Sequence, residues 1–179
     1  KTIILTSYVF TKNKNPTEVE HLPKTSKQTY YTVSPVQRSM YLLWKLNPLD
    51  TVYNIPFLWR LSSRLNVSQL EQAVEKLIER HEILRTKFII KNNMLYQQID
   101  ETPCIDFSTE KTSLTDEQSI IRHFTMPFDL EKGNLIRVRY IMATDQDYLF
   151  IDAHHSINDG MSNTILLKEL NHLYQNKPL

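Results

Sequence analysis

Hydrophobic and polar residues follow two rhythms along the chain from residue 30 onward. Segments that are short and apolar, or that alternate apolar with polar residues, are typical of strands. Apolar residues three or four positions apart are typical of amphipathic helices. Strands are predicted at residues 30–33, 52–61, 84–90, 94–99, 135–143 and 148–153. Because helical segments separate many of these strands, the pattern predicts an α/β fold, a two-layer sandwich of a mixed sheet and helices.

Three helices are predicted where a polar capping residue precedes an amphipathic segment. The capping pairs are Ser34 with Gln37, Asn66 with Gln69, and Thr115 with Gln118. Pro35 at the first helical position supports the first pair, and that helix is expected to end near residue 46. A fourth helix is expected to follow residue 160 and to run to about residue 175.

Residues 1–28 differ in composition from the rest of the chain. Residues 1–10 are apolar and β-branched and form a candidate strand, whereas residues 11–29 are almost entirely polar and include two prolines. Such a polar segment buries too little apolar surface to offset the entropy of ordering it. We therefore expect an N-terminal segment and interdomain linker at residues 1–28 and one folded unit at residues 29–179. A disordered tail is the alternative interpretation of the polar segment that begins at residue 11.

Composition excludes several classes of protein. With 179 residues, 41% of them hydrophobic, the chain has enough apolar material for one core. A net charge of +1 without a cluster of Lys and Arg predicts no binding to nucleic acid. No apolar run has the length of a membrane span, and the first ten residues do not resemble a secretory signal. The single Cys104 excludes an internal disulfide, and together these features predict a cytoplasmic protein.

A pair of histidines, His154 and His155, lies between a predicted strand and a predicted helix. Histidine exchanges protons near neutral pH, and a loop on a rigid scaffold can hold it in place. Neighbouring residues on an extended strand point to opposite faces, so these two side chains are poorly placed to chelate one ion, and we expect no metal site. We expect one histidine to face a cavity and the other to turn into the fold.

Four segments of the chain resemble the motifs of one enzyme family. Residues 154–160, HHSINDG, match HHxxxDG, and residues 80–88, RHEILRTKF, match RHExLRTxF. Residues 34–43, SPVQRSMYLL, resemble S-x-A-Q-x-R-L/M-W/Y-x-L, and residues 127–135, PFDLEKGNL, resemble the start of PFDLxxGPLxR, with Asn134 in place of proline. In this order, the motifs are similar to those of condensation domains of nonribosomal peptide synthetases, within the chloramphenicol acetyltransferase-like superfamily.

The resemblance implies the N-terminal lobe of a two-lobed domain, with the histidine loop on the floor of a tunnel between the lobes. The implied reaction forms an amide from a donor thioester and an acceptor amine. Phosphopantetheine arms of carrier proteins deliver both substrates, so no cofactor is expected to bind this chain directly. The implied partners are upstream and downstream carrier-protein domains, the C-terminal lobe of the same domain and an adenylation domain of the same synthetase. Because one wall of the tunnel is encoded here, the fragment alone is expected to be inactive.

The resemblance also assigns roles within the histidine loop. His155 is expected to be catalytic, either as a general base or by positioning the amine. His154 is expected to turn inward and to fix the loop, and Gly160 to leave room for a close approach of the substrate arm. Asp159 is expected to hold the turn through backbone hydrogen bonds or through an ion pair. Its partner in such a pair would be an arginine of the other lobe, Arg80 or Arg85.

The remaining motif residues are expected to be structural rather than catalytic. Arg80, Glu82 and Arg85 lie at and after the end of an amphipathic helix, where basic groups complement the helix dipole. Ser34 and Gln37 belong to the capping box. Two alternative functions stay open: a stand-alone or coenzyme A-dependent acyltransferase of the same fold, and a non-catalytic half-domain that docks carrier proteins.

Overall fold

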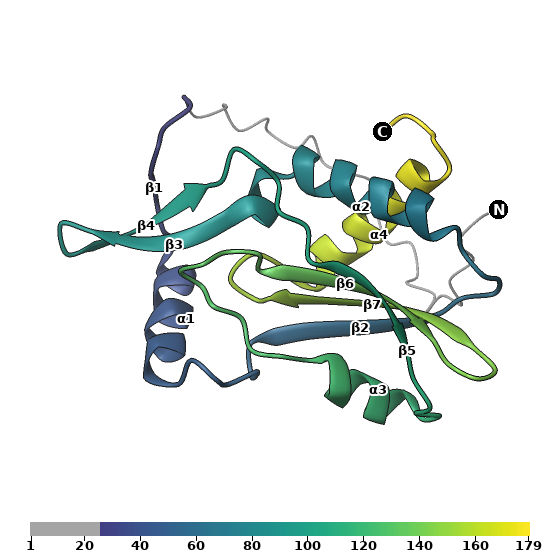
Figure 1. Ribbon diagram of the computed structural model, residues 1–179. Coiled ribbons are helices and arrows are strands. Elements are labelled where there is room, and N and C mark those ends of the chain that lie inside the picture. Colours follow the sequence, from purple (N-terminus) through teal and green to yellow (C-terminus); the bar gives the residue numbers. More distant parts are fainter. Residues whose placement is uncertain (1–25) are drawn as a thin grey trace, which may run out of the picture.

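The strand that leads to the histidines is the best buried element of the fold. The computed structural model describes residues 26–179, so the strand predicted at residues 1–10 and most of the predicted linker lie outside the described residues. Strand β7 (Asp147–His154) is buried along its whole length. It lies inside a four-stranded sheet of order β2-β7-β6-β5 (Figure 1). Strands β2 (Asn54–Arg60) and β6 (Ile136–Met142) are antiparallel to β7, and β5 (Phe107–Lys111) is parallel to β6, so this sheet is mixed as predicted.

A second sheet has three antiparallel strands in the order β1-β4-β3. These strands are β1 (Tyr31–Thr32), β4 (Met94–Ile99) and β3 (Thr86–Lys91). Asn92 and Asn93 connect β3 to β4 with positive φ angles of 50° and 59°. Two successive residues in this region are typical of a tight hairpin turn, and asparagine tolerates it well. The predicted hairpin is confirmed, and the strands of the fold divide between two sheets.

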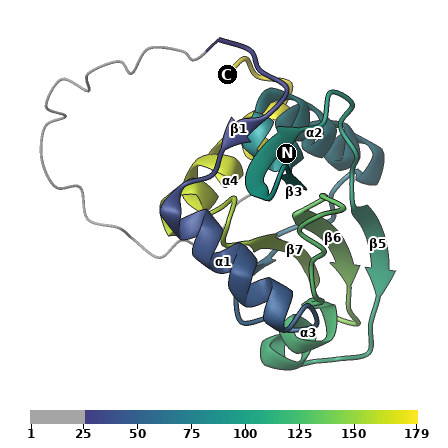
Figure 2. The same cartoon turned by 90° about the vertical axis from the view of Figure 1, so that its left-hand side faces the viewer.

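The helices pack on both faces of the four-stranded sheet. Helices α2 (Val67–Arg80) and α4 (Gly160–Tyr174) lie side by side on one face, and α3 (Glu117–Phe124) lies on the other (Figures 1 and 2). Helix α1 (Pro35–Leu46) runs beside the β3–β4 hairpin, and a short 3-10 helix, η1 (Glu82–Arg85), follows α2. None of the helices within residues 26–179 is long and apolar enough to cross a membrane.

Alternation along β7 divides its side chains between two apolar clusters. Leu149, Ile151 and Ala153 belong to the larger cluster with α2 and α4, whereas Tyr148 and Phe150 pack with Ile120 of α3. Because successive residues of a strand point to opposite faces, the residues at positions 152 and 154 continue the α3 face. Helix α3 ends before it reaches them, and this end of the face is covered by other groups described below.

Three sequence predictions differ from the structure. Strand β5 was not predicted, because its sequence FSTEK shows little apolar alternation. The predicted strand at residues 84–90 begins at Thr86, since η1 occupies residues 82–85. The cap predicted at Thr115 is wrong: Asp116 caps α3 and accepts a hydrogen bond from the Ser119 backbone N–H at 2.8 Å. Aspartate is an equally good capping residue, so local pattern alone did not separate the two positions.

Candidate active site

The two histidines lie at the end of a buried strand and before the N-terminus of a helix. His154 is the last residue of β7, and α4 begins at Gly160. The His154 backbone N–H donates to the Leu135 carbonyl at 2.9 Å, and the His155 N–H donates to the Tyr53 carbonyl at 2.8 Å. These bonds connect the start of the loop to segments on both sides of β7. The loop therefore leaves the sheet from a fixed position.

His154 turns into the fold and is only 4% exposed. Its ring lies 6.2 Å from the Tyr53 ring and 6.3 Å from the Phe128 ring. The Ser156 backbone N–H donates to His154 Nδ1 at 3.2 Å, and Ser156 Oγ lies 2.8 Å from the same atom. An atom that accepts from an N–H group carries no proton, so these partners assign the proton of the neutral ring to Nε2. Burial, with a smaller effect of the neighbouring His155, lowers the pKa of His154 to about 4, so the ring is neutral near pH 7.

His155 is exposed and adopts the opposite tautomer. Its Nδ1 lies 2.8 Å from the Asn158 carbonyl oxygen. Because a carbonyl oxygen only accepts, Nδ1 must carry the proton, and Nε2 of the neutral ring keeps a free lone pair. His155 lines an open hollow of about 350 Å³ together with the first half of α1, the rest of the loop and Ser162 of α4. A proton acceptor on a fixed ring at the edge of a hollow can act on a bound amine.

The end of the loop is held by a helix cap. Asp159 Oδ1 accepts a hydrogen bond from the Ser162 backbone N–H at 2.7 Å, which makes Asp159 the N-cap of α4. The hydrogen bonds from Ser162 lower the pKa of Asp159. The suggested ion pair with Arg80 or Arg85 is wrong, because Arg80 contacts Glu169 and Arg85 donates to backbone carbonyls. The structure contains the predicted backbone hydrogen bond, and an ion pair with an arginine of the other lobe stays a prediction.

Gly160 is the first residue of α4 and faces open space. A Cβ atom built on it would meet no heavy atom within 4 Å. Packing within the described residues therefore does not require a glycine here. The close approach of a substrate arm stays a prediction.

Residues of the RHExLRTxF motif lie away from the histidine loop, where the end of α2 meets α4. Glu169 of α4 lies 3.4 Å from Arg80 Nε and 2.6 Å from His81 Nε2, so this carboxylate links the end of α2 to α4. Arg85 donates to the carbonyls of Ile78, Glu79 and Asp100. Within residues 26–179, none of the hydrogen bonds or ion pairs found for these motif residues involves residues 154–160. The structural role of Arg80, Glu82 and Arg85 stays a prediction.

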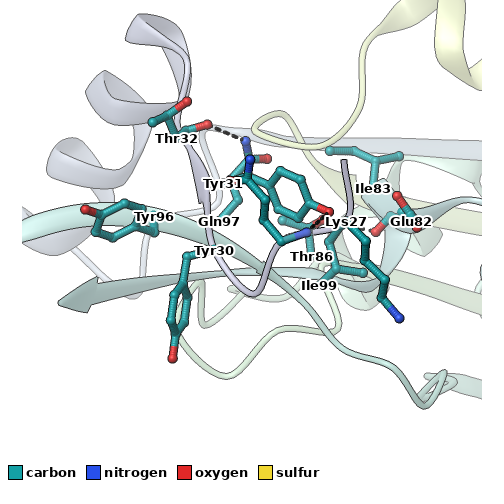
Figure 3. A pocket seen from close by; sticks show the side chains of 11 residues that line it. Lys27, Tyr30, Tyr31, Thr32, Glu82, Ile83, Thr86, Tyr96, Gln97 and Ile99 are labelled. Atoms are coloured by element: carbon teal, nitrogen blue, oxygen red, sulfur yellow. Dashed lines mark hydrogen bonds between the residues drawn. The ribbon is translucent and has the colours of Figure 1, made fainter. Parts of the chain in front are cut away.

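A larger hollow of about 1030 Å³ lies between β1 and η1 (Figure 3). Tyr31, Glu82 and Gln97 are among the residues that line it, so Glu82 of the motif faces this hollow and not the histidine loop. Gln97 donates to the Thr32 carbonyl at 3.0 Å on its wall. Neither histidine is among the lining residues.

A buried polar cluster beside His154 was missed from the sequence. Asp152 is fully buried, and its Oδ2 accepts from Asn54 Nδ2 at 2.7 Å and lies 3.5 Å from an Arg137 nitrogen. The Arg137 guanidinium lies 3.9 Å from the centre of the Phe128 ring, which in turn meets His154 edge-on. These groups cover the end of the sheet face that α3 leaves open. Arg137 also stands at the final position of the PFDLxxGPLxR pattern. This match was the one sequence feature that could have pointed to the cluster.

Within residues 26–179 no group of three His, Cys, Asp or Glu side chains is arranged to hold an ion. The Nδ1 atoms of both loop histidines are occupied by bonds within the loop. The groups available at the loop are the His155 imidazole, a helix N-terminus and oriented backbone groups.

The fold and the loop together define an α/β lobe in which a buried central strand ends in an HHxxxDG loop. Comparison with known families places this lobe more narrowly, since the model of the condensation domain matches residues 27–179. The chain therefore belongs to the condensation domain family.

Relatives agree with this assignment, and solved structures share the fold. Bacitracin synthase 1 of Bacillus licheniformis is 37% identical over 95% of this chain, and gramicidin S synthase 2 of Brevibacillus brevis is 38% identical over 86% of it. The chain spans only 3% and 4% of these two relatives. The starter condensation domain of rhizomide synthetase RzmA matches 84% of the chain and 40% of that structure, with a TM-score of 0.73 and 22% identity. The X-domain from teicoplanin biosynthesis matches 84% of the chain and 33% of that structure, with a TM-score of 0.74 and 21% identity. These two likenesses establish the fold.

Proposed function

We propose that this chain is the N-terminal lobe of a condensation domain that forms amide bonds in a nonribosomal peptide synthetase. The observation that carries the proposal is the tautomer of His155, which leaves Nε2 as a proton acceptor at the edge of an open hollow. The family assignment supplies the class of reaction. Residues 1–28 would be the N-terminal segment and linker, and residues 29–179 the lobe.

The proposed reaction joins two carrier-bound substrates. The acceptor nitrogen attacks the carbonyl carbon of the donor thioester, a C–N bond forms, and the C–S bond breaks to release the donor carrier thiol. The proton lost by the nitrogen passes to His155 Nε2 and then to the thiolate, so charge and atoms balance. His155 acts either as this general base or by holding the neutral amine in line with the carbonyl. Phosphopantetheine arms of carrier proteins deliver both substrates, and this chain binds no cofactor of its own.

The partners follow from the same proposal. An upstream and a downstream carrier-protein domain present the thioester and the amine, and an adenylation domain of the same cytoplasmic synthetase loads the carriers. The C-terminal lobe of the domain supplies the other wall of the site. Positioning two reactants contributes roughly 7–11 kcal/mol to lowering a barrier in well-oriented cases. The 179-residue chain alone is therefore expected to be inactive.

The test is a single-turnover assay of a complete condensation domain that contains this chain, with one carrier loaded as thioester and one as amine. His155→Ala is expected to reduce amide formation at least 100-fold while the thermal midpoint changes little, because the side chain is exposed. His123→Ala is the matched control, since His123 is an exposed histidine on α3.

Four outcomes would count against parts of the proposal. A near-normal rate for His155→Ala would remove this residue from the mechanism. Acyl transfer from coenzyme A without any carrier would favour the alternative acyltransferase. Carrier binding without amide formation by the intact domain would favour the docking half-domain. Adding the second lobe to the 179-residue chain should restore activity. Condensation by the chain alone would refute the proposal that this chain supplies only one wall of the site.

A further inference from the structure

Gln37 of α1 connects the capping box to the histidine loop. The Gln37 side-chain oxygen Oε1 accepts from the Ser34 backbone N–H at 2.9 Å, and the Gln37 backbone N–H donates to Ser34 Oγ at 3.1 Å. Its Nε2 donates to Gln97 Oε1 at 2.9 Å and to the Ser156 carbonyl at 3.1 Å. The side-chain oxygen accepts and the nitrogen donates twice, so the whole amide group is satisfied and its orientation is determined.

The bond to Ser156 restrains one peptide group inside the loop. The Ser156 carbonyl and the Ile157 N–H belong to the same planar peptide unit. The carbonyl accepts from Gln37, and the N–H donates to the His154 carbonyl at 3.0 Å. Rotation of this peptide would break both bonds. The turn that brings the Asn158 carbonyl to His155 Nδ1 contains this peptide.

Gln97 extends the same connection to the first strand. Its Nε2 donates to the Thr32 carbonyl of β1, and its Oε1 accepts from Gln37 (Figure 3 shows the bond to Thr32). A continuous series of side-chain amides therefore joins the second sheet to the histidine loop. The two ends of the Gln37–Ser156 bond are 119 residues apart in the chain.

We propose that Gln37, supported by Gln97, is a positioning residue that holds the Ser156 peptide and so keeps His155 in its Nδ1–H tautomer. The role rests on the proposed function of His155. Without Gln37 the peptide is released, the Asn158 carbonyl moves away from Nδ1, and the ring loses the bond that assigns its proton. The capping of α1 is a separate role of the same side chain, and the two roles can be separated by substitution.

Two variants separate the roles. Gln37→Glu keeps an acceptor for the Ser34 N–H, and glutamate suits this position of a capping box, but it has no donor for Ser156 or Gln97. Gln37→Met has a similar length and loses both roles. Gln146→Ala is the matched control. Like the Gln37 amide, the Gln146 amide donates two hydrogen bonds, both to backbone carbonyls, but it lies just before β7, at the opposite end of that strand from His154.

The first measurement is NMR of the 179-residue chain at pH 8, where imidazole is neutral. In both Gln37 variants, the ¹⁵N shifts of His155 should move toward the Nε2–H tautomer, and amide exchange at Ile157 should accelerate by about fivefold, as expected for the loss of one hydrogen bond. Exchange of the Arg38 amide, which donates to the Ser34 carbonyl, should accelerate in Gln37→Met only. Gln146→Ala should leave all of these signals unchanged.

The second measurement is the rate of amide formation in a complete condensation domain. Both Gln37 variants should reduce kcat by about tenfold or more with little change in KM, because the loop and not the binding of the carriers is affected. Unchanged His155 shifts and unchanged Ile157 exchange in Gln37→Glu would overturn the proposal, even if Gln37→Met unfolds. Absence of amide formation in the wild-type domain would instead refute the proposed function, while the NMR measurement would still decide the role of Gln37.

Discussion

The buried carboxylate beside His154 should make the stability of the protein depend on pH in an unusual direction. Asp152 is completely buried. Burial raises the pKa of Asp152 from 3.8 to about 6, against the opposing effects of the Asn54 hydrogen bond and the charges of Arg137 and Arg139. A folded pKa above the unfolded one means that folding favours the protonated form. The contribution to stability is fully present below pH 3.8 and is lost as the pH rises through about 6.

The magnitude follows from the two pKa values. Their difference corresponds to about 3 kcal/mol in the free energy of unfolding. Carboxylates with lowered pKa values, such as Asp129 and Glu131, have the opposite dependence and hide this effect in the wild-type curve. Asp152→Asn removes the titration and keeps an acceptor for Asn54. The free energy of unfolding of this variant relative to wild type should therefore rise by about 2.4 kcal/mol between pH 4 and pH 7, because part of the full effect is already lost at pH 4.

The assay is urea unfolding followed by tryptophan fluorescence at intervals of half a pH unit from pH 4 to pH 8. Trp44 is buried, so unfolding changes its environment. Asp145→Asn serves as the control, because Asp145 is exposed in the turn between β6 and β7. A difference between Asp152→Asn and wild type that stays constant across this range would refute the reasoning. A difference that falls with rising pH would show that the Arg137 charge outweighs burial.

Three further predictions test the loop and its supports. Asp159→Ala should lower the thermal midpoint by about 2–4 °C through loss of the α4 cap, whereas Asp159→Asn should not. An unchanged midpoint for Asp159→Ala with strongly reduced turnover would indicate that Asp159 acts directly in catalysis. Asn134→Pro introduces the usual family residue and should reduce the free energy of unfolding by more than about 1 kcal/mol, because Asn134 has a φ of 52° that proline cannot adopt. Equal stability of variant and wild type in urea would contradict a positive φ at this position. Glu169→Gln should reduce the free energy of unfolding by about 1 kcal/mol by weakening the contacts with Arg80 and His81, and no change in urea would show that packing alone holds α2 against α4.

Elements with strong local signals were predicted from the sequence alone. The capping box at Ser34 and Gln37, the amphipathic face of α2 and the hairpin with Asn92 and Asn93 depend on residues within a few positions of one another. Periodicity and capping are properties of short segments, so a sequence displays them directly. Strand β5 lacks such a signal, and it forms because Val138 and its neighbours offer a parallel partner.

The arrangement of the site was decided by tertiary structure. The sequence shows two adjacent histidines, and alternation predicts that they point apart, but the tautomer of each ring depends on what surrounds it. The hydrogen bond from Gln37 Nε2 to the Ser156 carbonyl joins residues 119 positions apart, and the bond between Asn54 and Asp152 joins residues 98 positions apart. No local pattern encodes such pairs, because they form only when packing brings distant segments together and places their polar groups in reach of one another. The sequence thus indicated which groups are proposed for the chemistry, and the fold decided which nitrogen of His155 keeps a free lone pair.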